Sequence, residues 1–103
     1  MSRVQIVALG VAALMGWSQM AGAADEQMGK KLSDSICAAC HGQNGIGIIA
    51  LYPNVAGQKR EYLVSQLRAF RDGSRKNAIM SPMATHLSDA DIDNVAVFFA
   101  SLR

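Results

Sequence analysis

The chain contains the pattern C-x-x-C-H at Cys37-Ala38-Ala39-Cys40-His41. This spacing puts two thiols about one helical turn apart, so each thiol can add to one of the two vinyl groups of a single haem. The imidazole of His41 follows directly and falls under the iron as an axial ligand. The pattern therefore predicts one covalently attached haem c, bonded to Cys37 and Cys40 and ligated by His41.

Three other interpretations of the two cysteines fit the chain less well. A C-x-x-C redox pair belongs in a βαβ setting, and no strand pattern follows residue 24. A zinc site needs four ligands, and the chain has only two cysteines, Cys37 and Cys40. A disulfide between cysteines so close in sequence restrains little chain, because the entropic gain grows with loop length.

The sixth position on the iron needs a side chain from elsewhere in the protein. After residue 41 the candidates are Met80, Met83 and His86, since Met28 is expected to pack in the core from the first helix. Methionine is commonly a core residue, so one of the pair would bind iron while the other packs nearby. A thioether raises the reduction potential relative to a second His. A filled sixth position favours electron transfer, and we expect no enzyme activity.

The first 23 residues have the pattern of a secretory signal peptide. Arg3 is the one charged residue of this segment, an apolar stretch covers 4–17, and an A-x-A cleavage site ends at Ala23. The apolar stretch is shorter than the about 20 residues that span a bilayer. We expect a signal peptide at 1–23 and one mature domain at 24–103, in a periplasmic protein that is not integral to the membrane. The alternative is an uncleaved anchor or a buried helix.

The mature segment shows helical periodicity in three places and no strand pattern. The helices are expected at 25–36, 59–72 and 88–102, and the loops between them at 42–58 and 74–87. Gly73 is placed to end the second helix, and Ser88 with Asp91 is placed to cap the third. The sequence thus predicts an all-α fold of three main helices with long loops that line a cofactor.

Charge is nearly balanced but unevenly distributed. The chain carries 10 Lys or Arg and 8 Asp or Glu, a formal net charge of +2, which does not indicate a nucleic-acid binder. Basic residues gather within 59–76, and acidic residues gather within 89–93. Such a dipole orients a carrier during encounter, so we expect transient electrostatic docking with redox proteins. Within the basic segment, Arg75 is the first candidate for a contact with a haem propionate.

Further motifs accompany the C-x-x-C-H pattern. They are Gly29 eight residues before Cys37, Tyr52-Pro53-Asn54-Val55-Ala56-Gly57-Gln58, Phe70 through Gly73, the run from Met80 to Asp89, and Ala96-Val97-Phe98-Phe99-Ala100-Ser101. Together they resemble a class I bacterial cytochrome c, and most of all the short domains that also occur in tandem in dihaem cytochromes. The similarity runs through residues 25–103.

The resemblance implies roles for several of these residues. The backbone carbonyl of Pro53 would accept a hydrogen bond from the second ring nitrogen of His41, which fixes the ring. Gly29 would let the first helix cross the last one closely, against Phe98. In this subgroup the ligand methionine stands seven residues before the Leu-Ser-Asp helix start, which selects Met80, with Met83 as the alternative.

A single C-x-x-C-H pattern predicts a monohaem cytochrome with a small cytochrome c fold. The predicted function is one-electron transfer between periplasmic or membrane redox partners, through a low-spin haem with His and Met axial ligands. Two alternatives come from other classes of protein. One is a dedicated electron-accepting haem subunit of a dehydrogenase, and the other is a haem sensor or peroxidase module.

Overall fold

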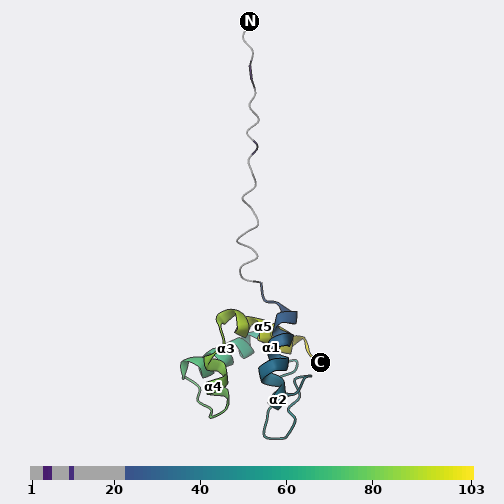
Figure 1. The fold of residues 1–103 in the computed structure, drawn as a ribbon, viewed down its shortest axis with the longest axis vertical. Helices are drawn as coiled ribbons and strands as arrows, with labels where there is room; N and C mark the ends of the chain where they lie inside the picture. Colours follow the sequence, from purple (N-terminus) through teal and green to yellow (C-terminus); the bar gives the residue numbers. More distant parts are fainter. Residues whose placement is uncertain (1–3, 6–9, 11–22) are drawn as a thin grey trace.

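The computed structural model describes residues 4–5, 10 and 23–103, and the regular structure within them is helical, without strands (Figure 1). The elements are α1 (Glu26–Leu32), η1 (Ser33–Cys37), α2 (Ala38–His41), α3 (Arg60–Asp72), α4 (Met80–Thr85) and α5 (Asp89–Ser101). The all-α prediction is confirmed. The expected signal peptide falls almost wholly outside the described residues. In the described part, no helix is both long and apolar enough to cross a membrane.

One continuous helical run carries the C-x-x-C-H pattern. Its first turn is capped by Asp25, whose carboxylate accepts hydrogen bonds from the N–H groups of Gln27 and Met28 at 2.9 and 3.0 Å. The run passes from α1 through η1, a π-helical turn, into α2, where it ends before Gly42. The predicted helix ended at residue 36 and was too short, because the π-helical turn keeps the backbone hydrogen-bonded past Cys37.

Helix α1 crosses α5 at Gly29, as the family resemblance implied. Gly29 is buried, and a Cβ at this position would collide with the carbonyl oxygen of Asn94 and lie 2.9 Å from the Cβ of Phe98. Ser33, one helical turn later, is also fully buried. The expectation that Met28 packs in the core is wrong, because its side chain is 52 % exposed. The two buried residues of this part of the run, Gly29 on α1 and Ser33 on η1, are small and permit the close crossing.

The hydrophobic core is centred on α5. Ile92, Val95, Ala96, Phe98 and Phe99 are buried on this helix. Four further apolar residues are buried: Leu63 and Phe70 on α3, Ala84 on α4, and Leu87 just before α5. The helices predicted at 59–72 and 88–102 are thus confirmed within one residue at each end. Helix α5 packs against both α1 and α3, so it holds together the two halves of the domain.

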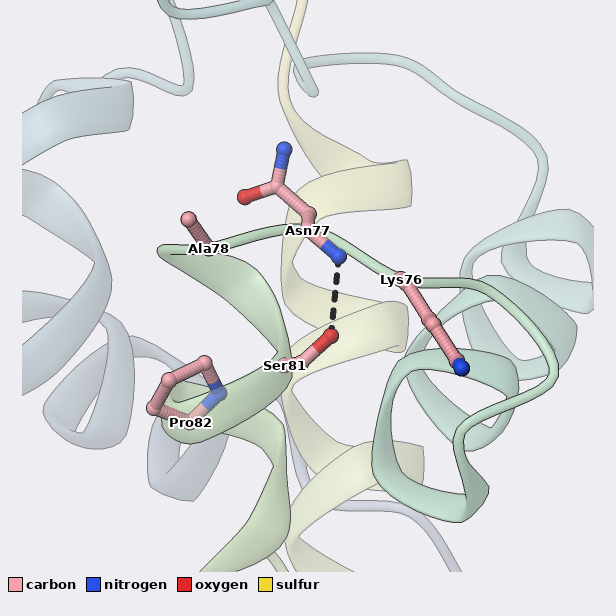
Figure 2. A pocket seen from close by; sticks show the side chains of 5 residues that line it. All are labelled: Lys76, Asn77, Ala78, Ser81 and Pro82. Carbon is pink, nitrogen blue, oxygen red and sulfur yellow. Dashed lines mark hydrogen bonds between the residues drawn. The ribbon is translucent and has the colours of Figure 1, made fainter.

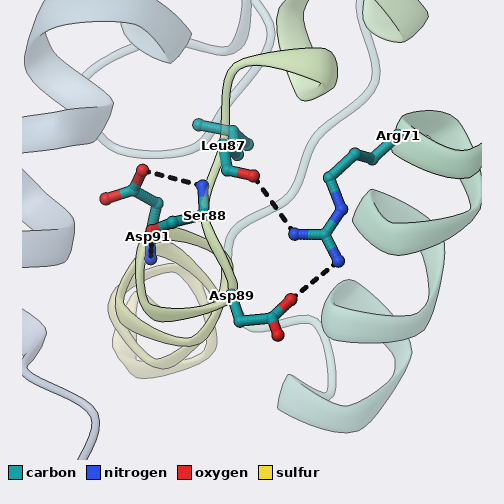
Figure 3. A network of polar contacts seen from close by, with 5 residues as sticks. All are labelled: Arg71, Leu87, Ser88, Asp89 and Asp91. Carbon is teal, nitrogen blue, oxygen red and sulfur yellow. Dashed lines mark hydrogen bonds and ion pairs between the residues drawn. The ribbon is translucent and has the colours of Figure 1, made fainter.

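The junction between α3 and α5 is fixed by polar contacts (Figure 3). The guanidinium of Arg71 donates to the backbone carbonyl of Leu87 at 3.1 Å and to the carboxylate of Asp89 at 2.7 Å. Ser88 and Asp91 form the predicted reciprocal capping box, with both hydrogen bonds at 3.0 Å. Gly73 ends α3 in the left-handed conformation, as expected.

Helix α4 lies where the sequence predicted an irregular loop. It has six residues and packs against α3. Its length is below what a periodicity argument can detect, and Pro82 in its middle argued against a helix. The turn is instead started by a side chain: Asn77 accepts hydrogen bonds from the N–H groups of Ile79 and Met80, each at 2.9 Å.

Candidate functional site

Cys37, Cys40 and His41 lie at the end of the first helical run. Cys37 is the last residue of η1 and packs against the core made by α3 and α5. Cys37 and Cys40 form no disulfide, and both are half-buried. Burial raises the pKa of the Cys37 thiol to about 11, so this group is a neutral thiol at neutral pH. The two thiols are therefore present as separate, unpaired groups on one short helical segment.

The imidazole of His41 is oriented by the loop that follows it. Its Nδ1 lies 2.9 Å from the backbone carbonyl oxygen of Pro53. Because a carbonyl oxygen only accepts, Nδ1 must carry the proton and Nε2 must carry the free lone pair. The contact expected between His41 and Pro53 is thus present, and it leaves Nε2 as the nitrogen that can bind a metal ion.

Backbone hydrogen bonds hold the loop at 42–58 in the shape that presents Pro53. The carbonyl of buried Gly45 accepts from the N–H groups of Val55 and Ala56, at 2.8 and 3.0 Å. Gly45 has a φ of +73°, and its Cα lies so close to Ala56 that a Cβ would be 2.9 Å from the backbone nitrogen. Glycine is therefore required here for both conformation and space.

The same loop carries a group of exposed apolar side chains. Ile46, Ile48, Ile49 and Leu51 are between 51 % and 75 % exposed. A small domain rarely leaves so many large apolar side chains uncovered within one segment. The loop also contains no charged residue. Both features suit a segment that an apolar group or a partner surface covers.

The candidates for the sixth iron position lie on the short helix α4. Met80 is its first residue and Met83 its fourth, and both side chains are half-buried. His86 directly follows the helix and is exposed. In Figure 1, α2 and α4 lie at the same end of the molecule, on either side of it, below α1, α3 and α5. We call residues 77–86 the methionine segment. The fold therefore brings the C-x-x-C-H segment and the methionine segment to one end of the domain.

Arg75 has two partners on α3 that the sequence did not suggest. Its guanidinium donates to the side-chain oxygen of Gln66 at 2.7 Å and lies 4.6 Å from the centre of the Phe70 ring. The N–H of Arg75 also bonds to the carbonyl of Ala69 at 3.0 Å. Arg75 thus holds the start of the segment at 74–79 against α3.

Sequence reasoning missed Asn77, which starts the methionine segment. It lies beside a surface depression of about 460 Å³ that is lined by Lys76, Asn77, Ala78, Ser81 and Pro82 (Figure 2). The sequence carried a signal for this role, because an Asn side chain typically accepts hydrogen bonds from the backbone N–H groups two and three residues after it. The depression itself is open to solvent and contains no methionine or cysteine.

The residues at this end of the molecule fit a covalently bound haem. Two free thiols, a histidine with a free Nε2, half-buried thioethers and uncovered apolar side chains are the groups such a cofactor uses. Within the described ranges, no group of three or more His, Cys, Asp or Glu side chains could hold a metal ion by themselves. The donor set therefore favours an iron held in a macrocycle over a zinc site.

Comparisons with known proteins agree with this donor set. The Cytochrome c family profile matches residues 26–103. Cytochrome c-554(548) of Halomonas halodenitrificans is 48 % identical over 68 residues, which cover 63 % of this chain and 82 % of that protein. The solved structure of cytochrome c4 from Acidithiobacillus ferrooxidans is similar with a TM-score of 0.72 and 29 % identity, over 80 % of this chain and 53 % of that one.

Another relative carries a functional description in its name. The thiosulfate dehydrogenase electron acceptor of Thiomonas intermedia is 47 % identical over 68 residues, which cover 65 % of this chain and 31 % of that protein. The chain therefore spans about a third of this relative and about half of the cytochrome c4 chain, but most of the cytochrome c-554(548).

Proposed function

Because the chain belongs to the cytochrome c family, whose members carry electrons on a covalently attached haem c, we propose that Cys37 and Cys40 hold that haem and that His41 and Met80 are its axial ligands. Met83 is the alternative to Met80. The observation that carries this proposal is the hydrogen bond from His41 Nδ1 to the carbonyl oxygen of Pro53, which leaves Nε2 free at the end of a C-x-x-C-H segment.

The haem supplies the one-electron chemistry, and the chain's residues set how it is held. Two thioether bonds to one short helical segment prevent loss of the cofactor by dissociation. The carbonyl of Pro53 keeps the His41 ring in one orientation and one tautomer, and makes its Nε2 a stronger donor. A methionine thioether opposite His41 raises the reduction potential relative to a second histidine.

The protein is proposed to be a carrier without enzyme activity of its own. Its relatives are named as cytochromes and as an electron acceptor. With His41 and Met80 both bound, no iron position is left for substrate or oxygen. A haem sensor or peroxidase would instead need an open or easily opened sixth position.

Export to the periplasm and docking on redox partners complete the proposal. The basic residues Lys59, Arg60, Arg68 and Lys76 are exposed and are available to an acidic partner surface. The charge separation is smaller than the sequence suggested, because Arg71 pairs with Asp89 and because Arg68 and Asp93 line the same depression between α3 and α5. Docking is therefore proposed to use the exposed pair Lys59 and Arg60 at the start of α3, where Arg60 lines the same depression as Glu61 and Asp93.

A second candidate function is a dedicated electron acceptor for one dehydrogenase. The observation in its favour is the 47 % identity to a thiosulfate dehydrogenase electron acceptor. Copurification with one dehydrogenase, at physiological salt and at a fixed stoichiometry, would support this role over that of a free carrier.

The experiment that tests haem attachment uses the exported protein. Its mass should exceed that of the polypeptide by one haem, and denaturation should not release the pigment. The reduced protein should bind carbon monoxide weakly or slowly, because Met80 occupies the sixth position. Free thiols in the native protein would contradict the attachment, and rapid, tight carbon monoxide binding would favour a sensor or peroxidase.

A further inference from the structure

The methionine segment has few apolar contacts to hold it. Every residue from 72 to 79 is exposed, and Ile79, directly before Met80, is 48 % exposed. Helix α4 is only six residues long, and Ala84 is its one buried residue. A helix this short is not stable by itself, so specific hydrogen bonds must define where its first residue lies.

We propose that Asn77 is a positioning residue, which holds the backbone of Met80 so that its thioether can bind the iron. This inference rests on the proposed assignment of Met80 as the axial ligand. The side-chain oxygen of Asn77 accepts hydrogen bonds from the N–H of Ile79 and from the N–H of Met80 itself, each at 2.9 Å. One side chain thus fixes the two peptide units that precede the ligand's Cα.

Asn77 is itself held in place from the other side (Figure 2). Its backbone N–H donates to the hydroxyl of Ser81 at 2.9 Å, and its carbonyl accepts from the N–H of Ser81 at 3.0 Å. The segment before it is tied to α3 by Arg75 through Gln66 and Phe70. A chain of contacts therefore runs from α3 to Arg75, from Arg75 through the Ser81 hydroxyl to Asn77, and from Asn77 to Met80.

Loss of the Asn77 side chain should leave the fold intact and make Met80 easier to displace. Without the acceptor oxygen, the N–H groups of Ile79 and Met80 turn to water, and the first turn of α4 opens more often. Each opening frees the iron for a competing ligand. The expected consequence is tighter apparent binding of an added ligand, with the same absorption spectrum at rest.

The test is imidazole binding to the oxidised holoprotein, compared among four proteins. Asn77→Ala should bind imidazole about fivefold more tightly than wild type, the factor that corresponds to loss of one helix cap. Asn77→Asp keeps an acceptor oxygen and should restore the wild-type dissociation constant within about twofold. The weak red absorbance band of the Fe(III)–thioether bond should be present in wild type, Asn77→Ala and Asn77→Asp.

Asp25→Ala is the matched control, because Asp25 also accepts from two successive N–H groups at the start of a helix, at 2.9 and 3.0 Å. It should lower the stability to denaturant about as much as Asn77→Ala does and leave imidazole binding unchanged. Equal imidazole binding by Asn77→Ala and wild type would overturn the proposal. So would an equal increase in Asp25→Ala, which would show a general loss of stability.

A fourth variant separates this inference from the ligand assignment. Met80→Ala should lose the red band entirely. If Met80→Ala keeps the band, the assignment of Met80 is wrong, and the role of Asn77 falls with it. If Met80→Ala loses the band while Asn77→Ala binds imidazole like wild type, the ligand assignment stands and only the role of Asn77 is overturned.

Discussion

The two loops that serve the proposed iron site are held by different kinds of interaction. The loop at 42–58 is shaped by backbone hydrogen bonds to buried Gly45, and it contributes a backbone atom, the carbonyl oxygen of Pro53. The segment at 73–88 is shaped by the side chains of Arg71, Arg75 and Asn77, and it carries the proposed ligand side chain, the thioether of Met80.

This difference indicates which side of the site is rigid and which side can open. Backbone bonds around a buried glycine break only when the loop unfolds, whereas exposed side-chain bonds break one at a time. The histidine side should therefore be rigid, and the methionine side should open locally. Four predictions test or refine this contrast.

The largest effect is expected from removal of the ligand on the methionine side. Met80→Ala should abolish the red band of the Fe(III)–thioether bond and lower the reduction potential, because the soft thioether favours Fe(II) and a harder oxygen or nitrogen donor in its place favours Fe(III). Met83→Ala should leave both unchanged. Absorbance spectroscopy and potentiometric titration measure the two properties. The reverse result would assign the iron to Met83, and absence of the band in the wild-type protein would point to His86.

The next effect concerns the glycine on the histidine side. Gly45→Ala should lower the free energy of unfolding by about 2 to 4 kcal/mol. The alanine would be strained in the left-handed conformation, and its Cβ would also collide with Ala56. Gly73→Ala is the control: its φ is +89°, but no atom lies within 4 Å of an added Cβ. Denaturant unfolding should show a loss of about 1 kcal/mol there. Equal losses would mean that strain alone matters.

A smaller effect is expected from pH at the junction between α3 and α5. The hydrogen bond and charge of Arg71 lower the pKa of Asp89 below its usual 3.8. At a pH between the folded and the usual pKa of Asp89, the unfolded chain binds more protons than the folded chain. The contribution of this ion pair to stability is therefore complete above the usual pKa, and it is lost as the pH falls through the folded pKa. Acid unfolding of Asp89→Asn should lack this component, and Arg71→Ala should remove the same component. Additive effects of the two changes would disprove the coupling.

The smallest effect concerns docking at the start of α3. The rate of electron transfer with the native partner should fall as the salt concentration rises, because the screening length of charges falls to about 10 Å at 0.1 M salt. Lys59→Glu with Arg60→Glu should slow the reaction at low salt. Lys30→Glu is the control, because Lys30 lies on α1 and already pairs with Asp34 at 2.7 Å. If the stopped-flow rates change with neither salt nor charge reversal, the basic residues do not guide docking, and the uncharged loop at 42–58 is the docking surface.

Helix boundaries show where sequence reasoning succeeded and where it stopped. The helix of α5 was predicted with its cap, because Ser88 and Asp91 act on backbone groups within four residues of each other. Helix α4 was missed, because its start depends on the side chain of Asn77 rather than on apolar periodicity. The exposure of Met28 was also missed, because the close approach of α5 at Gly29 decides which face of α1 is buried.

The sequence by itself determined what depends on neighbours along the chain: the C-x-x-C-H spacing, the Ser88 cap and the glycine that ends α3. Only the tertiary structure decided the pairing of Arg71 with Asp89 and the partners of Arg75, because these contacts join residues that are 18 and 9 positions apart. Which residues meet across such distances depends on how α3, α4 and α5 pack. Local propensity carries no information about that packing, so the sequence analysis counted Arg71 only as part of a basic segment and assigned Arg75 only to a haem propionate.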